Sequence, residues 1–158
     1  MASKAKRCPV APISINEMDV SKIAPRLYQG GLEEFHGCQI AISGVNLVVK
    51  LTSDDTDTRI LWPDLIEFPL EDEVEDLQYL SDLNTLAGKI ARSIRNGDKV
   101  AIFCRQGRNR SGLLTGLVLR RLYKWDGLRI VNHIRSRRAD ALYGGGGDHF
   151  AEWFVDNF

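Results

Sequence analysis

The sequence has no apolar run long enough to cross a membrane. A membrane-spanning helix needs about 18 or more consecutive apolar residues, and every apolar stretch of this 158-residue chain is much shorter. The first residues are basic and no apolar core follows them, so we do not expect a signal peptide. Net charge is absent as well, because 21 Lys and Arg residues balance 21 Asp and Glu residues. Without a global basic field, any attraction for nucleic acid or another anion must be local.

Cysteine is scarce too, with three residues at positions 8, 38 and 104. An odd number with no C-x-x-C pair argues against a disulfide framework. Because disulfides are rare in the cytosol, we expect three reduced thiols and a cytoplasmic location. The three histidines show no spacing typical of metal ligands, so we expect neither a metal ion nor another cofactor.

Strand patterns and helix patterns alternate along most of the chain. Strands are predicted at residues 26–31, 46–52, 65–70 and 99–103, and helices at 77–94, 111–124, 127–138 and 148–158. The alternation predicts an α/β domain with a mostly parallel central sheet and helices on both faces. Residues 1–14 are small and basic with two prolines, which is typical of a flexible tail. We therefore expect a tail at 1–14 and one domain at 15–158.

The segment between the predicted strand at 99–103 and the next helix carries the candidate site. It reads C-R-Q-G-R-N-R-S over residues 104–111, and in open α/β sheets the carboxyl end of a strand is where ligands bind. Backbone N–H groups of such a loop, with the helix N-terminus, can hold an oxyanion. Gly107 permits the torsions of a tight curl, and Arg110 offers a planar fork for two phosphate oxygens. The predicted phosphate-binding residues are Arg105, Gln106, Gly107, Arg108, Asn109 and Arg110.

The same cations act on the cysteine at the start of this segment. A helix N-terminus and neighbouring arginines promote ionisation of a thiol, and the thiolate is the nucleophile. We therefore predict that Cys104 attacks a phosphorus atom held by the loop. The alternative is an inert core cysteine beside a solvated arginine face. The order strand, cysteine, glycine, arginine, serine and helix favours the catalytic interpretation.

This segment resembles the C-x-x-G-x-x-R-S/T signature of the cysteine-dependent protein tyrosine phosphatases. The small size and the segments "IAPRLYQGG" (23–31) and "IRSRRADAL" (134–142) resemble the dual-specificity branch. The resemblance covers residues 20–158. It implies a protein tyrosine phosphatase-like fold and a metal-free reaction in two steps, in which Cys104 takes the phosphoryl group and water releases it. It also implies that Ser111 donates a hydrogen bond to the departing thiolate, while a helix cap is its other possible role.

The resemblance further implies an aspartate that protonates the leaving oxygen, about thirty residues before the cysteine. Asp72 precedes Cys104 by 104 − 72 = 32 positions, just after the predicted strand at 65–70, and is our choice. Glu71, Glu73 and Asp76 are the alternatives. Acidic residues also favour a helix start, so most of these side chains are expected to be solvated.

One position departs from the pattern. The family usually has histidine immediately before the nucleophile, where this chain has Phe103. That histidine orders the loop and helps to ionise the thiol. Its absence predicts a thiol that is harder to ionise, or compensation by Arg105 and Arg108, but not an inactive enzyme.

Four functions remain open on the sequence. The first is a phosphatase for phosphotyrosine, and for phosphoserine or phosphothreonine, in a protein partner, acting as a monomer. The second uses Arg105 and Arg108 for a phosphoinositide or an RNA 5′-triphosphate, and Asn109 resembles the RNA triphosphatases of this superfamily. The third is sulfur transfer, since rhodanese-like domains also place a cysteine in an anion-binding loop. The fourth is a module that binds phosphate without turnover.

Overall fold

A five-stranded sheet forms the centre of the computed structural model, which describes residues 8–52, 56–70, 79–143 and 147–158. Its strand order is β2-β3-β8-β5-β7. The strands are β2 (Val20–Ala24), β3 (Leu27–Gly31), β5 (Leu47–Lys50), β7 (Asp64–Glu67) and β8 (Val100–Cys104). Only the pair β2 and β3 is antiparallel among these neighbours. The predicted α/β class with a mostly parallel sheet is confirmed.

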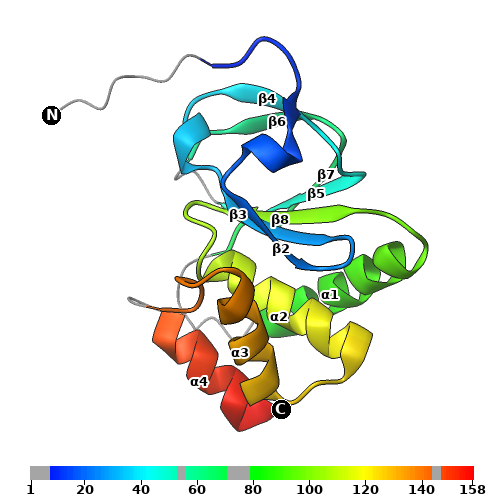
Figure 1. Ribbon diagram of the computed structural model, residues 1–158, viewed down its shortest axis with the longest axis vertical. Coiled ribbons are helices and arrows are strands. Elements are labelled where there is room, and N and C mark those ends of the chain that lie inside the picture. Colours follow the sequence, from blue (N-terminus) through cyan, green and yellow to red (C-terminus); the bar gives the residue numbers. More distant parts are fainter. Residues whose placement is uncertain (1–7, 53–55, 71–78, 144–146) are drawn as a thin grey trace, which may run out of the picture.

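Four α-helices cover one face of this sheet (Figure 1). They are α1 (Leu80–Arg95), α2 (Arg110–Tyr123), α3 (Gly127–Arg137) and α4 (Gly147–Asn157). Asp126 caps α3, because its carboxylate accepts a hydrogen bond of 2.9 Å from the Arg129 N–H. Within the described ranges, none of the helices has the length and apolarity that a bilayer span requires.

The other face is covered by a second, three-stranded sheet in place of the helices that we expected there (Figure 1). It contains β1 (Ile13–Ser14), β4 (Gln39–Ser43) and β6 (Arg59–Trp62), all parallel. Two 3-10 helices flank its strands in the sequence. The first, η1 (Ile15–Glu17), follows β1, and the second, η2 (Glu33–Phe35), precedes β4. The reason is visible in β4, where Ile40 and Ile42 are buried and alternate with exposed or half-buried residues. A period of two builds a strand and cannot build a helix.

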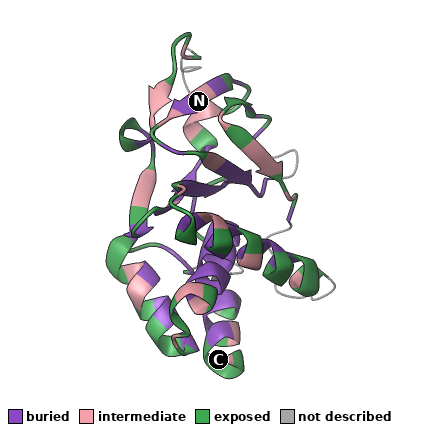
Figure 2. Cartoon of the chain, turned by 90° about the vertical axis from the view of Figure 1, so that its right-hand side faces the viewer, coloured by how far each residue is buried: buried purple, intermediate pink, exposed green. Residues whose placement is uncertain are grey.

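Strand β8 separates two hydrophobic clusters because its side chains alternate between the two faces of the sheet. Val100, Ile102 and Cys104 pack on the helical side, and Ala101 and Phe103 pack on the side of the small sheet. All five residues are buried, which is typical of a central strand of a parallel sheet. Figure 2 shows buried residues concentrated where the sheets and the helices meet. The alternation places the Cys104 thiol on the helical side, where α2 begins.

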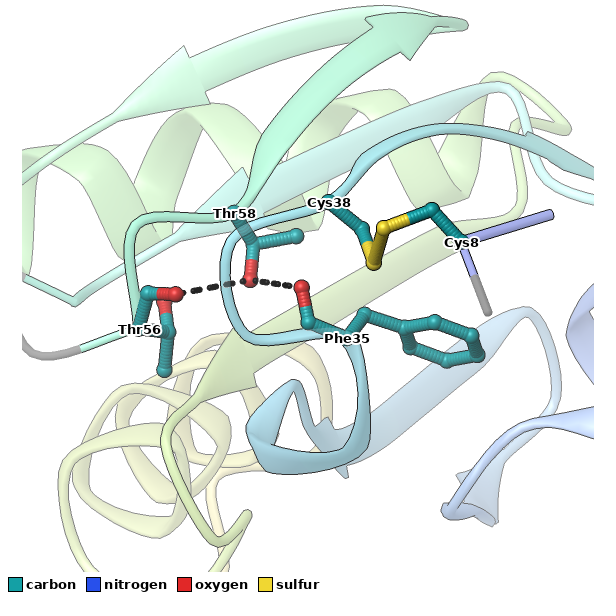
Figure 3. Close-up of a disulfide and its surroundings, with 5 residues drawn as sticks. All are labelled: Cys8, Phe35, Cys38, Thr56 and Thr58. Atoms are coloured by element: carbon teal, nitrogen blue, oxygen red, sulfur yellow. Dashed lines mark hydrogen bonds between the residues drawn. A yellow bond between two sulfur atoms is a disulfide. The ribbon is translucent and has the colours of Figure 1, made fainter. Parts of the chain in front are cut away.

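The expectation of three reduced cysteines is wrong for two of them. Cys8 and Cys38 form a disulfide with a Cα–Cα distance of 5.3 Å (Figure 3). They are 30 positions apart, and parallel pairing of β1 with β4 brings the segments that precede these strands together. Cysteine spacing carries no information about such a pairing. The division into a tail at 1–14 and a domain at 15–158 stays a prediction, although Ile13 and Ser14 already form β1.

Counting thiols tests the disulfide directly. We expect one thiol per chain to react with an aromatic disulfide reagent after unfolding without reductant, and three after treatment with a dithiol. Reductant should also lower the melting temperature of the wild type, because the open chain gains conformational entropy when it unfolds. The Cys8→Ser variant should melt at the same temperature with and without reductant. Three reactive thiols in the untreated protein would contradict the pairing.

Candidate active site

The segment predicted to bind phosphate forms a tight turn at the carboxyl end of the middle strand of the sheet. Cys104 ends β8, with β3 and β5 on its two sides, and Arg110 begins α2. We call residues 104–110 the cysteine loop. Gly107 has φ of +72°, and a Cβ atom at this position would overlap the backbone of Gly30. Both observations require glycine here.

The first carbonyl groups of the cysteine loop point toward the segment that follows β3. They point away from the space that the loop encloses, which we call its inner side. The Leu32 N–H donates to the carbonyl oxygens of Cys104 and Arg105, at 3.0 Å each. The Glu33 N–H donates to the Arg105 carbonyl, also at 3.0 Å. The start of the loop is thus held from outside by the backbone of residues 32–33.

The middle of the loop is held in the same direction by two side chains. The Gly107 carbonyl accepts hydrogen bonds from Gln29 Nε2 at 2.9 Å and from Arg138 Nε at 2.7 Å. The Gln106 carbonyl accepts one from an Arg138 Nη atom at 3.0 Å. Both donors are buried, so water does not compete strongly for these carbonyl groups.

The carbonyl group near the end of the loop also points outward, because the Arg108 carbonyl accepts a hydrogen bond of 3.1 Å from the Leu142 N–H. In a trans peptide the C=O and the following N–H point in opposite directions. The outward carbonyl groups of residues 104–107 therefore direct the N–H groups of residues 105–108 to the inner side. There, no residue in the described ranges accepts a hydrogen bond from them. An oxyanion is the natural acceptor for such a ring of amides.

The thiol and the serine predicted to support it lie together. Cys104 Sγ is 3.2 Å from Ser111 Oγ, and both residues are buried. The S–H of a thiol donates to this hydroxyl, and the hydroxyl donates in turn to a thiolate. Because α2 already begins at Arg110, Ser111 lies within the helix and is not its cap.

Arg110 connects the loop to the segment that should carry the acid. Its side chain is 8% exposed, and one Nη atom donates a hydrogen bond of 3.2 Å to the Leu70 carbonyl. Leu70 is two residues before Asp72 in the chain. Asp72 itself, with the alternatives Glu71, Glu73 and Asp76, lies outside the described residues. Its role as the acid stays a prediction.

Comparison with known proteins finds similar structures but no protein of similar sequence. No family model and no curated protein matches the sequence. The structure is similar to that of a mouse protein provisionally assigned as a dual specificity phosphatase and solved with zinc tungstate, with a TM-score of 0.68, 19% identity and coverage of 97% of this chain and 93% of that one. It is also similar to human DUSP28, with a TM-score of 0.67, 19% identity and coverage of 95% and 97%. A human tyrosine phosphatase-like serine/threonine/tyrosine-interacting protein gives a TM-score of 0.65 at 12% identity, with coverage of 87% and 95%.

The chain has the dual-specificity phosphatase fold. The fold implied by the resemblance is thereby confirmed. In this fold the cysteine loop of the present chain lies where β8 passes into α2, and residues 104–111 keep the cysteine, arginine and serine of the signature.

Phe103 has no polar role in this phosphatase fold. Its ring is fully buried in the cluster under the small sheet, on the opposite face of β8 from the thiol. The two arginines that we expected to compensate for the missing histidine are paired with carboxylates. One Nη atom of Arg105 is 3.2 Å from Glu33 Oε1, and Arg108 Nε is 2.9 Å from Asp140 Oδ2.

Arg138 is a residue of the candidate site whose role the sequence did not reveal. Arginine side chains are mostly exposed, but Arg138 is 7% exposed. Besides the loop carbonyls, its guanidinium donates to Asp19 at 2.9 and 3.0 Å and to Ser21 Oγ at 3.2 Å. These two partners are 119 and 117 positions away. No local pattern in α3 indicates such contacts.

Replacing Arg138 by methionine should loosen the cysteine loop. The change leaves the Gln106 carbonyl without its donor, and we expect the free energy of unfolding to fall by about 3 kcal/mol. We also expect weaker inhibition by inorganic phosphate, because the inward N–H groups lose their alignment. Urea unfolding and inhibition assays measure the two effects.

Arg137→Met is the matched control for this variant. Arg137 is exposed, and among the described residues it has no hydrogen-bonding or ionic partner. Its loss should change stability by less than about 0.5 kcal/mol. Equal effects of the two substitutions would show that Arg138 does not hold the loop.

Proposed function

We propose that this protein is a cysteine-dependent phosphatase that hydrolyses phosphate esters of proteins, with phosphotyrosine as the first substrate and phosphoserine or phosphothreonine as further ones. The observation that carries the proposal is the cysteine loop, whose carbonyl groups from Cys104 to Arg108 are all bonded outward. A thiol thus lies at the base of a ring of inward N–H groups. The dual-specificity phosphatase fold supports the same assignment.

In the first step the Cys104 thiolate attacks the phosphorus atom in line with the ester oxygen. The S–P bond forms as the P–O bond to the substrate breaks, and Asp72 gives its proton to the leaving oxygen. The loop N–H groups and Arg110 bind the three remaining phosphate oxygens, whose charge they stabilise. Tyrosine or serine then leaves as a neutral alcohol.

In the second step water releases phosphate from the cysteine. Asp72, now ionised, takes a proton from the water as its oxygen attacks phosphorus, and the S–P bond breaks. The sulfur leaves as a thiolate, to which the Ser111 hydroxyl donates a hydrogen bond across the observed 3.2 Å. Stabilising this leaving group speeds the step. Ser111 therefore acts on turnover of the intermediate and not on its formation.

A side-by-side assay with trapping of the intermediate tests the proposal. The substrates are a phosphotyrosine peptide, a phosphothreonine peptide, a phosphoinositide and an RNA 5′-triphosphate. We expect the fastest hydrolysis with the phosphotyrosine peptide, and acid quenching followed by mass spectrometry should find phosphate on Cys104. Tight phosphopeptide binding without hydrolysis would instead support a binding module. Consumption of thiosulfate in the presence of cyanide would support sulfur transfer.

A further inference from the structure

Three arginines around the cysteine loop are each paired with a carboxylate from another part of the chain. The pairs are Arg105 with Glu33 at 3.2 Å, Arg108 with Asp140 at 2.9 Å and Arg138 with Asp19 at 2.9 Å. The carboxylates come from η2, from the segment after α3 and from the residue before β2. Their side chains are 54%, 52% and 58% exposed. All three carboxylates are therefore accessible from solvent.

A cavity of about 370 Å³ lies beside the loop, and these carboxylates line it. Gln106 and Arg108 of the loop form part of its wall. Three arginines, Arg108, Arg137 and Arg138, line it together with the three carboxylates, so the lining has no net formal charge. The substrate groups next to the reacting phosphate would occupy such a space.

The charge of the groups around the loop affects which class of substrate can bind. A phosphoinositide or an RNA 5′-triphosphate carries further phosphate groups beyond the one that reacts, and these need cations without carboxylate partners. Arg105 and Arg108 were the candidates, but Glu33 and Asp140 neutralise them, which leaves Arg137 as the one arginine of the lining without an ion pair among the described residues. A second phosphate placed there would come within a few ångströms of a carboxylate, where like charges repel.

We infer that Glu33 and Asp140 are specificity residues, which exclude polyanionic substrates and select phosphopeptides with neutral or basic residues beside the phosphorylated one. The inference rests on the proposed phosphatase function. Exposed ion pairs contribute little to stability, so these two pairs are better explained by their effect on the substrate. Removing the carboxylates should also release Arg105 and Arg108 for anions.

The test compares two phosphotyrosine peptides that differ only in lysine or glutamate residues on both sides of the phosphotyrosine. For each enzyme, kcat/KM on a peptide is divided by kcat/KM on a small aryl phosphate, which corrects for changes in the chemistry itself. The wild type should prefer the lysine peptide. Each carboxylate removed should shift the ratio by about fivefold, so the Glu33→Gln/Asp140→Asn double variant should shift it by roughly 25-fold toward the glutamate peptide. Hydrolysis of a phosphoinositide should rise in the same variant.

The matched control removes two acidic charges from the exposed surface of α4. Glu152 and Asp156 are exposed there, and the Glu152→Gln/Asp156→Asn variant should leave the ratio unchanged. High salt should reduce the preference of the wild type, because exposed charges are screened. If the wild type hydrolyses the aryl phosphate but the two double variants behave alike, this inference is wrong and the phosphatase function stands. If no substrate is hydrolysed, both fail.

Discussion

Replacing Cys104 by serine is expected to abolish phosphate-ester hydrolysis while leaving phosphate binding intact. A serine hydroxyl is not ionised near neutral pH, and the structure shows no base beside this position among the described residues that would activate it. Loss of a covalent nucleophile costs on the order of 10⁴-fold or more in kcat. The inward N–H groups and Arg110 are unchanged in the variant. Inorganic phosphate should therefore bind within a few-fold of the wild-type affinity.

The measurement is a kcat determination on an aryl phosphate, with calorimetric titration of inorganic phosphate into both proteins. Cys38→Ser is the control, because Cys38 lies in the cluster on the opposite face of the sheet from the thiol. That variant should lose the disulfide but keep its turnover. Full activity of Cys104→Ser would refute the role of Cys104 as the nucleophile. Loss of phosphate binding in this variant would refute phosphate binding by the N–H groups of the loop.

Asp72→Asn is expected to slow hydrolysis of a phosphotyrosine peptide by about 10²-fold or more, since general acid catalysis contributes effects of 10²–10⁴. The asparagine cannot give a proton to the tyrosine oxygen. A substrate whose phenol is strongly acidic needs less help, so the loss on a nitrophenyl phosphate should be smaller. The variant should also lose the fall in kcat at high pH, which reports deprotonation of the acid.

Glu71→Gln, Glu73→Gln and Asp76→Asn are the controls for this assignment. Each removes one acidic charge from the same segment and should change kcat far less than Asp72→Asn. A large loss in one of them, with Asp72→Asn active, would transfer the acid to that residue. If none of the four matters on phosphotyrosine, this segment does not supply the acid, and the RNA 5′-triphosphatase alternative becomes the better assignment.

The sequence alone was sufficient for the elements next to the site. Four apolar residues in a row predicted β8, and helical spacing after Ser111 predicted α2, because such patterns depend on the burial of one or both faces. The signature of residues 104–111 identified Cys104, Arg110 and Ser111, and the structure brings the thiol and the serine into contact. A site motif whose residues are close together in the sequence can be recognised from the sequence alone.

Only the tertiary structure decided what surrounds the loop. The groups that turn its carbonyls outward belong to Gln29, Leu32, Glu33, Arg138 and Leu142, and nothing in their local patterns marks them. The same holds for the Cys8–Cys38 disulfide and for the small sheet that replaces helices on one face. Arg105 and Arg108 looked like extra charge for a polyanionic substrate until Glu33 and Asp140 were found beside them. Periodicity and local spacing predict elements and short motifs, but contacts between distant segments depend on how those elements pack.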